Sequence, residues 1–256
     1  MDEIPKSHPR YHSLIIRKNL VDAFRQGIVV PEGLIAHGRG EALDYILGEK
    51  TLEPAYNAIE AASALLLTSE NPVISVNGNT AALVPRELVE LSKITNAKLE
   101  VNLFHRTLER EIKIGDLLKS YGADEVLGIG SDASETIPGL ESKRRFVSRR
   151  GIYYADTVLL ALEDGDRTEQ LVKMGKNVIA IDLNPFSRTA RAAKITIVDN
   201  VTRAMPLLIE YCKKLSTRQP SELAEIIRRF DNETNLKMMI KAIRDRLSAL
   251  SFFEVV

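Results

Sequence analysis

Hydrophobic residues are arranged in two ways along the central part of this chain. Short β-branched runs, such as 178–181 and 195–198, are too brief for buried helices and predict strands. Longer segments with apolar residues at every third or fourth position predict helices. The strands are expected near residues 73–76, 98–104, 124–128, 155–162, 178–181 and 195–198. Because predicted helices separate them, we expect an α/β fold with a doubly wound, mostly parallel, Rossmann-like sheet in three layers.

Helical patterns without strands flank this alternation. Residues 14–27 and the alanine-rich segment 53–69 predict helices before the sheet, and 201–214 predicts one after it. Two further amphipathic segments follow residue 216, and we expect them either to cover one edge of the sheet or to pack in a dimer. Between the first helices, Gly38-Arg39-Gly40 predicts a turn where the backbone approaches a ligand.

These patterns predict a single α/β domain over residues 1–256. We divide it into an N-terminal arm with helices (1–70), a Rossmann-like core (71–215) and a C-terminal helical extension (216–256). Within the core, residues 129–151 are polar and rich in Ser, Gly and Arg, which is typical of a long functional loop or a small subdomain.

Composition narrows the class of protein. The 35 Lys and Arg residues balance 35 Asp and Glu residues, which argues against a general binder of nucleic acid or membrane surfaces. The single cysteine, Cys212, cannot form a disulfide within the chain and is expected to be a buried apolar residue. No apolar run reaches the roughly 18 residues of a membrane span, and the first residues do not resemble a signal peptide. We therefore expect a soluble, cytoplasmic protein.

Polar side chains follow most of the predicted strands. Any one of them is explained as an ordinary turn or N-cap residue, but together at the carboxyl edge of a parallel sheet they favour a ligand site. They are Asn77, Asn79, Asn102, Glu163, Asp164, Asp166, Asp182, Asn184, Asp199 and Asn200.

The segment 177–200 carries the clearest of these patterns. Its two strands end in Asp182-Leu183-Asn184 and in Asp199-Asn200, and Ser187-Arg188-Thr189 lies between them, where a hydroxyl can cap a short helix. Asp and Asn bind sugars or bases, and an arginine with free backbone N–H groups binds phosphate. The segment therefore predicts half of a nucleotide site.

Several catalytic motifs are missing from the sequence. It contains no P-loop, no G-x-G-x-x-G after a first strand, no G-x-S-x-G and no His-rich metal motif. The 4 histidines are each expected to be structural, with His8 and His37 the least easily explained in that way. What remains is anion binding by basic residues next to acidic groups, which favours phosphoryl or nucleotidyl transfer. Spacing alone predicts that Arg17 is a solvated helix residue.

Longer motifs add a resemblance. The stretches IPKSHPRYHSL, GLIAHGRGEALDYILGE, PVISVNGNTAALVP, LEVNLFHRT, LEDGDRTEQL and VIAIDLNPFSRTARAAKITIVDN, spread over about residues 4–210, resemble the archaeal 4-phosphopantoate–β-alanine ligases, also called phosphopantothenate synthetases. The resemblance implies an ATP-dependent condensation of 4-phosphopantoate with β-alanine that releases AMP and diphosphate, on the route to coenzyme A. It also implies a homodimer with a Rossmann-like core.

The resemblance further implies which residues contact ATP, and it overrides the spacing argument for Arg17. Arginines would hold phosphates, and the Asp and Asn residues would hold ribose and adenine. The implied ATP contacts are Arg17, Arg39, Asp182, Leu183, Asn184, Arg188, Thr189, Asp199 and Asn200.

We hypothesise an acyl-adenylate intermediate, with Mg²⁺ accompanying ATP and no metal site built from protein ligands alone. The phosphate and carboxylate of 4-phosphopantoate are assigned to Lys6, His8, Arg10, Asn77 and Asn79. No residue is assigned as the base for the amine.

Other classes of function fit the same site. A nucleotide-binding regulator would bind ATP without turnover, and a kinase for a small hydroxy acid would yield ADP. An NAD-dependent oxidoreductase is the weakest alternative.

Overall fold

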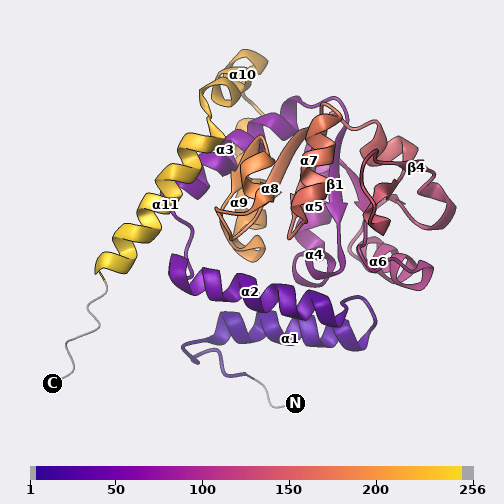
Figure 1. Cartoon of the computed structure of the whole chain (residues 1–256), viewed down its shortest axis with the longest axis horizontal. Helices are drawn as coiled ribbons and strands as arrows, with labels where there is room; N and C mark the ends of the chain where they lie inside the picture. The colour runs from indigo at the N-terminus through magenta and orange to yellow at the C-terminus, as the bar shows by residue number, and fades with distance from the viewer. Residues whose placement is uncertain (1–3, 250–256) are drawn as a thin grey trace.

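A six-stranded parallel sheet forms the centre of the computed structural model, which describes residues 4–249 (Figure 1). The strand order is β3-β2-β1-β6-β7-β8. This confirms the predicted doubly wound α/β sheet. The strands are β1 (Pro72–Val76), β2 (Lys98–Val101), β3 (Val126–Leu127), β6 (Thr157–Ala161), β7 (Asn177–Ile181) and β8 (Ile195–Ile197).

Helices cover both faces of this sheet, which is why its strands are apolar on both sides. Alternate residues of β1 show the division: Ile74 packs into the cluster with α3, α5 and α9, whereas Val73 packs into the cluster with Leu171 of α7 and Ala193 at the end of α8. Both β1 and β6 are buried at every position. The helices are α3 (Glu53–Thr68), α5 (Pro85–Thr95), α7 (Gly165–Lys173), α8 (Arg188–Ala192) and α9 (Val201–Leu215). Cys212 is buried on α9, as predicted.

The polar segment between β3 and β6 folds into a small unit of its own. It contains a two-stranded antiparallel sheet of β4 (Glu135–Thr136) and β5 (Phe146–Val147), with the short turns η1 (Gly130–Asp132), η2 (Lys143–Arg145) and η3 (Arg149–Tyr153). The buried carboxylate of Glu100 on β2 anchors this unit, because it accepts hydrogen bonds from the backbone N–H groups of Ser148 (3.0 Å) and Ile152 (2.6 Å).

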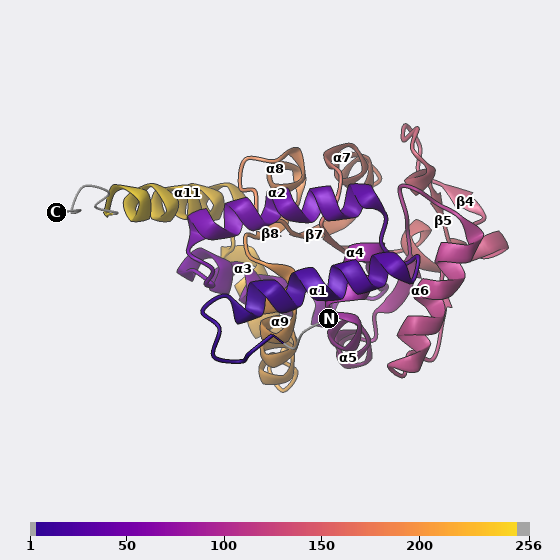
Figure 2. The same ribbon diagram turned by 90° about the horizontal axis from the view of Figure 1, so that it is seen from below.

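Helices α1 (Tyr11–Arg25) and α2 (Pro31–Leu47) lie side by side across the carboxyl edge of the sheet (Figure 2). The turn predicted at Gly38-Arg39-Gly40 is wrong, because these residues lie inside α2. The missing side chains allow close packing instead: a Cβ on Gly40 would lie 3.4 Å from the side chain of Leu183, and one on Gly33 would lie 2.4 Å from Asn79 Oδ1.

Helices α4 (Gly78–Leu83) and α6 (Leu108–Ser120) follow β1 and β2. At the other end of the chain, α10 (Pro220–Arg229) and α11 (Asn232–Ala249) pack against α3, and α11 then extends away from the sheet (Figure 1). Asn232 Oδ1 accepts a hydrogen bond of 2.8 Å from the backbone N–H of Thr196 on the edge strand β8. The start of α11 therefore covers this edge, one of the two expected arrangements. None of the helices within residues 4–249 is long and apolar enough to cross a membrane.

Candidate functional site

The strand order of the sheet reverses between β1 and β6. In open α/β sheets ligands bind outside the carboxyl ends of the strands at such a switch point. A cavity of about 330 Å³ lies there, beneath the first half of α2. We call it the switch-point cavity; its lining includes Asn77, Gly78 and Asn79 after β1, and Leu162 and Asp164 after β6.

Asn77 and Asn79 hold the walls of this cavity. Asn77 caps α4, because its Oδ1 accepts a hydrogen bond from Thr80 N (3.0 Å), and its Nδ2 donates to the carbonyl of Ala161 at the end of β6 (2.8 Å). Asn79 Nδ2 donates to the carbonyl of Gly33 on α2 (2.8 Å). Both residues line the cavity, and their side-chain amides fix α2 and β6 relative to β1.

Arginines from distant parts of the chain converge on the same cavity. Arg39 comes from α2, Arg110 from α6 and Arg144 from η2. Arg110 Nη2 donates to the carbonyl of Ile28 (2.8 Å), and its buried Nε has no hydrogen-bond partner among the described residues. Burial lowers the pKa of Arg110, but a guanidinium stays protonated in proteins. The cavity is therefore suited to an anion with several oxygens. The sequence motifs did not single out Arg110 or Arg144; the only signals were the arginine-rich segment 129–151 and the position of Arg110 just after the FHRT motif.

A buried chain of charges supports Arg144. Its guanidinium pairs with Glu163, whose other oxygen accepts a bond of 2.5 Å from Arg167 Nη1. Arg167 is fully buried and also donates to Ser75 Oγ on β1 (3.2 Å). Desolvation raises the pKa of neighbouring Asp164, while Arg144 opposes this shift. The chain fixes the position of Arg144 from beneath the site.

The predicted nucleotide residues after β7 form a compact loop. Asp182 Oδ1 accepts a hydrogen bond from Asn184 N (2.9 Å), and its Oδ2 accepts one from Ser187 Oγ (2.5 Å). Ser187 in turn accepts a bond from Ala190 N (2.9 Å) and caps α8, as predicted. Burial raises the pKa of the Asp182 carboxyl, and the charge of Arg39 opposes that shift. Arg39 therefore acts on both the switch-point cavity and this loop.

The residues after β8 join α9 to α2. Asp199 accepts bonds from Thr51 Oγ1 (2.6 Å) and Arg203 Nε (2.9 Å), and Asn200 Nδ2 donates to Asp44 Oδ2 on α2 (2.9 Å). Arg203 also pairs with Asp44 at 2.6 Å. Burial raises the pKa of Asp199, and the positive charge of Arg203 opposes this effect.

The other predicted ATP contacts are more dispersed. Thr189 Oγ1 donates to the carbonyl of Glu163 (3.0 Å), which links α8 to the end of β6. Arg188 is exposed and pairs with Glu169 at 2.7 Å. Arg17 lies on α1 and pairs with Glu41 of α2 at 2.8 Å.

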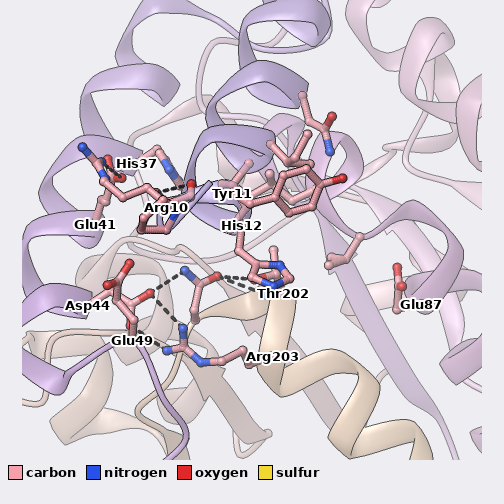
Figure 3. A pocket seen from close by; sticks show the side chains of 18 residues that line it. Arg10, Tyr11, His12, His37, Glu41, Asp44, Glu49, Glu87, Thr202 and Arg203 are labelled. Atoms are coloured by element: carbon pink, nitrogen blue, oxygen red, sulfur yellow. Dashed lines mark hydrogen bonds and ion pairs between the residues drawn. The ribbon is translucent and has the colours of Figure 1, made fainter. Parts of the chain in front are cut away.

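The residues assigned to 4-phosphopantoate fall into separate places. Asn77 and Asn79 line the switch-point cavity, whereas Lys6 and His8 are exposed in the N-terminal arm. Arg10 lines a second cavity of about 610 Å³ between α1, α2 and the start of α9, the hairpin cavity (Figure 3).

Known proteins are similar to this chain over almost its whole length. A family model described as phosphopantothenate/pantothenate synthetase matches residues 54–246. Proteins named 4-phosphopantoate–β-alanine ligase from Thermococcus kodakarensis and Thermococcus onnurineus are each 52% identical over 252 residues, which covers 98% of this chain and 96% of theirs. A protein of the same name from Methanosarcina mazei is 49% identical over 251 residues, 98% of each chain. The similarity thus continues past residue 210, where the recognisable motifs end, and the chain belongs to the phosphopantothenate/pantothenate synthetase family.

Proposed function

We propose that this protein is an ATP-dependent ligase of the cytoplasm that joins 4-phosphopantoate to β-alanine. The products would be 4′-phosphopantothenate, AMP and diphosphate, on the route to coenzyme A. The family and the names of the relatives support the ligation. The observation that supports it most is the convergence of Arg39, Arg110 and Arg144 on the switch-point cavity. The helix that carries Arg39 also packs against the loop after β7, because a Cβ on Gly40 would lie 3.4 Å from the side chain of Leu183.

The switch-point cavity fits the acid substrate. A phosphate monoester carries a charge near −2 at neutral pH and accepts several charge-assisted hydrogen bonds. Arg110 offers a buried Nε that lacks a partner among the described residues, and Arg144 is fixed from below by Glu163. We therefore assign the 4-phosphate to Arg110 and Arg144, with Asn77 and Asn79 shaping the cavity.

The carboxyl ends of β7 and β8 fit ATP. Asp182, Asn184, Asp199 and Asn200 would hold ribose and adenine, and Leu183 and Thr189 would form the wall between them. Arg39 and Arg188 would bind phosphates. To contact ATP, Arg17 would exchange its ion pair with Glu41 for a phosphate oxygen. Mg²⁺ usually binds through substrate phosphates with one or two carboxylates, and it would neutralise charge on the triphosphate here.

Arg39 lies where the two substrates would meet, because it lines the switch-point cavity and its charge acts on Asp182. The carboxylate of 4-phosphopantoate would attack the α-phosphorus of ATP there, and diphosphate would leave. Positioned cations stabilise the negative charge that develops in such a transfer. The amine of β-alanine would then displace AMP from the acyl-adenylate.

A homodimer is also proposed. Ile35 and Ile46 are exposed on α2, at 68% and 37%, and lie three turns apart on one face of the helix. Exposed apolar side chains on one helix face are typical of an interface between copies of a chain.

Product analysis tests the proposed reaction. The protein is mixed with ATP, Mg²⁺, 4-phosphopantoate and β-alanine, and nucleotides are separated by chromatography. AMP and diphosphate that form only when both organic substrates are present support the ligase. ADP would indicate a kinase instead, no consumption of ATP would leave a nucleotide-binding protein, and a change in nicotinamide absorbance with NAD and a hydroxy acid would indicate an oxidoreductase.

A further inference from the structure

The proposed reaction has so far given no role to the hairpin cavity as a whole. Figure 3 shows His37, Glu41 and Asp44 of α2 on one side of it, with Arg10 and His12 nearby and Arg203 of α9 below. Its lining includes Asn200, one of the proposed nucleotide contacts. A second residue assigned to ATP, Arg17, pairs with Glu41 in the same lining, so the cavity adjoins the proposed ATP site.

Most charged groups of this cavity are already paired. Asp44 and Arg203 neutralise each other, and Glu41 accepts bonds from Arg17 and from Tyr45 Oη. Arg10 is more exposed than Arg203: it donates to Tyr45 Oη (2.6 Å) and lies 3.6 Å from Glu41, and its side chain is 47% exposed. It can therefore turn to a carboxylate that enters the cavity.

His37 supplies an imidazole to the lining of this cavity. It is half-buried one helical turn before Glu41, and no residue within 4–249 forms a hydrogen bond with its imidazole. Burial lowers its pKa most; the charge of Arg17 lowers it too, and those of Glu41 and Asp44 raise it. The imidazole is consequently neutral near pH 7 and can accept a proton.

The other titratable groups around the cavity come from several elements. Its lining also includes Arg10 and His12 from the start of the chain, Glu49 after α2, Glu87 of α5 and Arg203 of α9. Acidic and basic groups are mixed, so the cavity suits a ligand that carries both charges.

We propose that the hairpin cavity receives the amine substrate, a short ω-amino acid, that Arg10 pairs with its carboxylate, and that His37 removes a proton from its ammonium group. This rests on the ligase function proposed above. A primary alkyl ammonium has a pKa near 10.4, so roughly one molecule in a thousand is a free amine near neutral pH. A base at this position therefore supplies the nucleophile.

Amide formation requires the ammonium group to lose two protons in all. The ammonium gives one proton to an imidazole nitrogen of His37, and the freed lone pair on nitrogen attacks the acyl carbon of the acyl-adenylate. The C–N bond forms, and the bond from that carbon to the phosphate oxygen breaks with its electron pair on AMP. The second N–H proton leaves with the AMP phosphate, and His37 returns its proton to water.

Two acyl acceptors test the role of His37. The intact protein and the variant His37→Gln are given ATP, Mg²⁺ and 4-phosphopantoate with either β-alanine or hydroxylamine, whose nitrogen is already unprotonated near neutral pH. General-base catalysis contributes about 10²–10⁴-fold, so kcat/KM with β-alanine should fall by at least about 100-fold, while hydroxamate formation changes by less than about threefold. Raising the pH should partly restore the variant with β-alanine. The exchange of labelled diphosphate into ATP with 4-phosphopantoate alone should stay unchanged.

The outcomes separate this inference from the ligase function. An equal loss with both acceptors, or no loss with β-alanine, overturns the role of His37. Absence of both diphosphate exchange and AMP release in the unaltered protein would instead overturn the proposed ligase. Equal thermal unfolding of the variant and the unaltered protein excludes misfolding as the cause.

Arg10→Gln tests the other half of the proposal. Loss of a charge-assisted bond should raise the KM for β-alanine about tenfold or more and leave the KM for 4-phosphopantoate unchanged. The control is Arg218→Gln, because Arg218 is similarly exposed, at 53%, and among the described residues its side chain pairs with Glu222 on α10 alone. A rise in the KM for 4-phosphopantoate alone would show that Arg10 binds 4-phosphopantoate, as predicted from the sequence, and would overturn its assignment to β-alanine.

Discussion

Removing the charge of Glu163 should strongly destabilise the protein. Its side chain is 2% exposed and lies between Arg144, which is 8% exposed, and Arg167, which is fully buried. In Glu163→Gln the amide oxygen can still accept from one arginine, but its NH₂ group faces the donors of the other. Breaking a buried ion pair by removing one partner costs about 3–5 kcal/mol, because the remaining charge stays buried and uncompensated. Within residues 4–249, Ser75 Oγ is the only other acceptor of a hydrogen bond from Arg167.

The expected change is large enough for calorimetry. Each kcal/mol shifts the Tm of a domain of this size by roughly 2–4 °C, so Glu163→Gln should lower Tm by about 10 °C. We would measure thermal unfolding by differential scanning calorimetry at neutral pH. Because Arg144 loses its support, the KM for 4-phosphopantoate should rise as well.

The chain offers a matched control on its surface. Glu225 on α10 also lies between two arginines, Arg228 and Arg229, at 2.7 and 2.5 Å, and these pairs lower its pKa to about 2. Because all the partners are exposed, solvent and salt screen the interaction, and Glu225→Gln should leave Tm unchanged. Equal Tm values for the two variants would refute the argument that burial makes the Glu163 cluster important.

Further variants test the site and its framework. Arg39→Ala should reduce kcat/KM for AMP release at least tenfold, since a lost charge-assisted phosphate contact costs about 1.5–3 kcal/mol, and near-normal turnover would contradict its role. Gly78→Ala should destabilise the fold, because its Cβ would lie 2.5 Å from the carbonyl oxygen of Ile28. The Cβ of Gly38→Ala meets no atom within 4 Å, so this change should stabilise the protein by up to about 1 kcal/mol through the helix propensity of alanine in α2. Urea unfolding measures both changes. Burial raises the pKa of Glu100 from its ordinary value of 4.5 to about 7, so the folded state should lose stability as the pH rises through this range. Glu100→Gln should remove this part of the pH dependence. Parallel curves of Tm against pH for the variant and the unaltered protein would contradict the argument.

Local sequence determined the elements of the sheet and some details of the site. Short β-branched runs became strands because each fits a strand buried on both faces, and the alternation with helices required parallel crossovers. Ser187 was identifiable as a helix cap because its bond to Ala190 N spans only three residues. The edge positions of Asp182 and Asp199 followed from the same strand pattern.

Only the tertiary structure decided which residues of other elements lie near those strand ends. Gly38-Arg39-Gly40 predicts a turn when taken alone, but packing of α2 against the loop after β7 keeps these residues helical. Arg110 and Arg144 line the switch-point cavity from two elements that are far apart in the sequence. Because such a cavity produces no periodic pattern along the sequence, these two arginines could not be identified from the sequence alone. Burial, which is why we expect Glu163→Gln to destabilise the protein and Glu225→Gln not to, is likewise a property of the packed chain and not of the residue type.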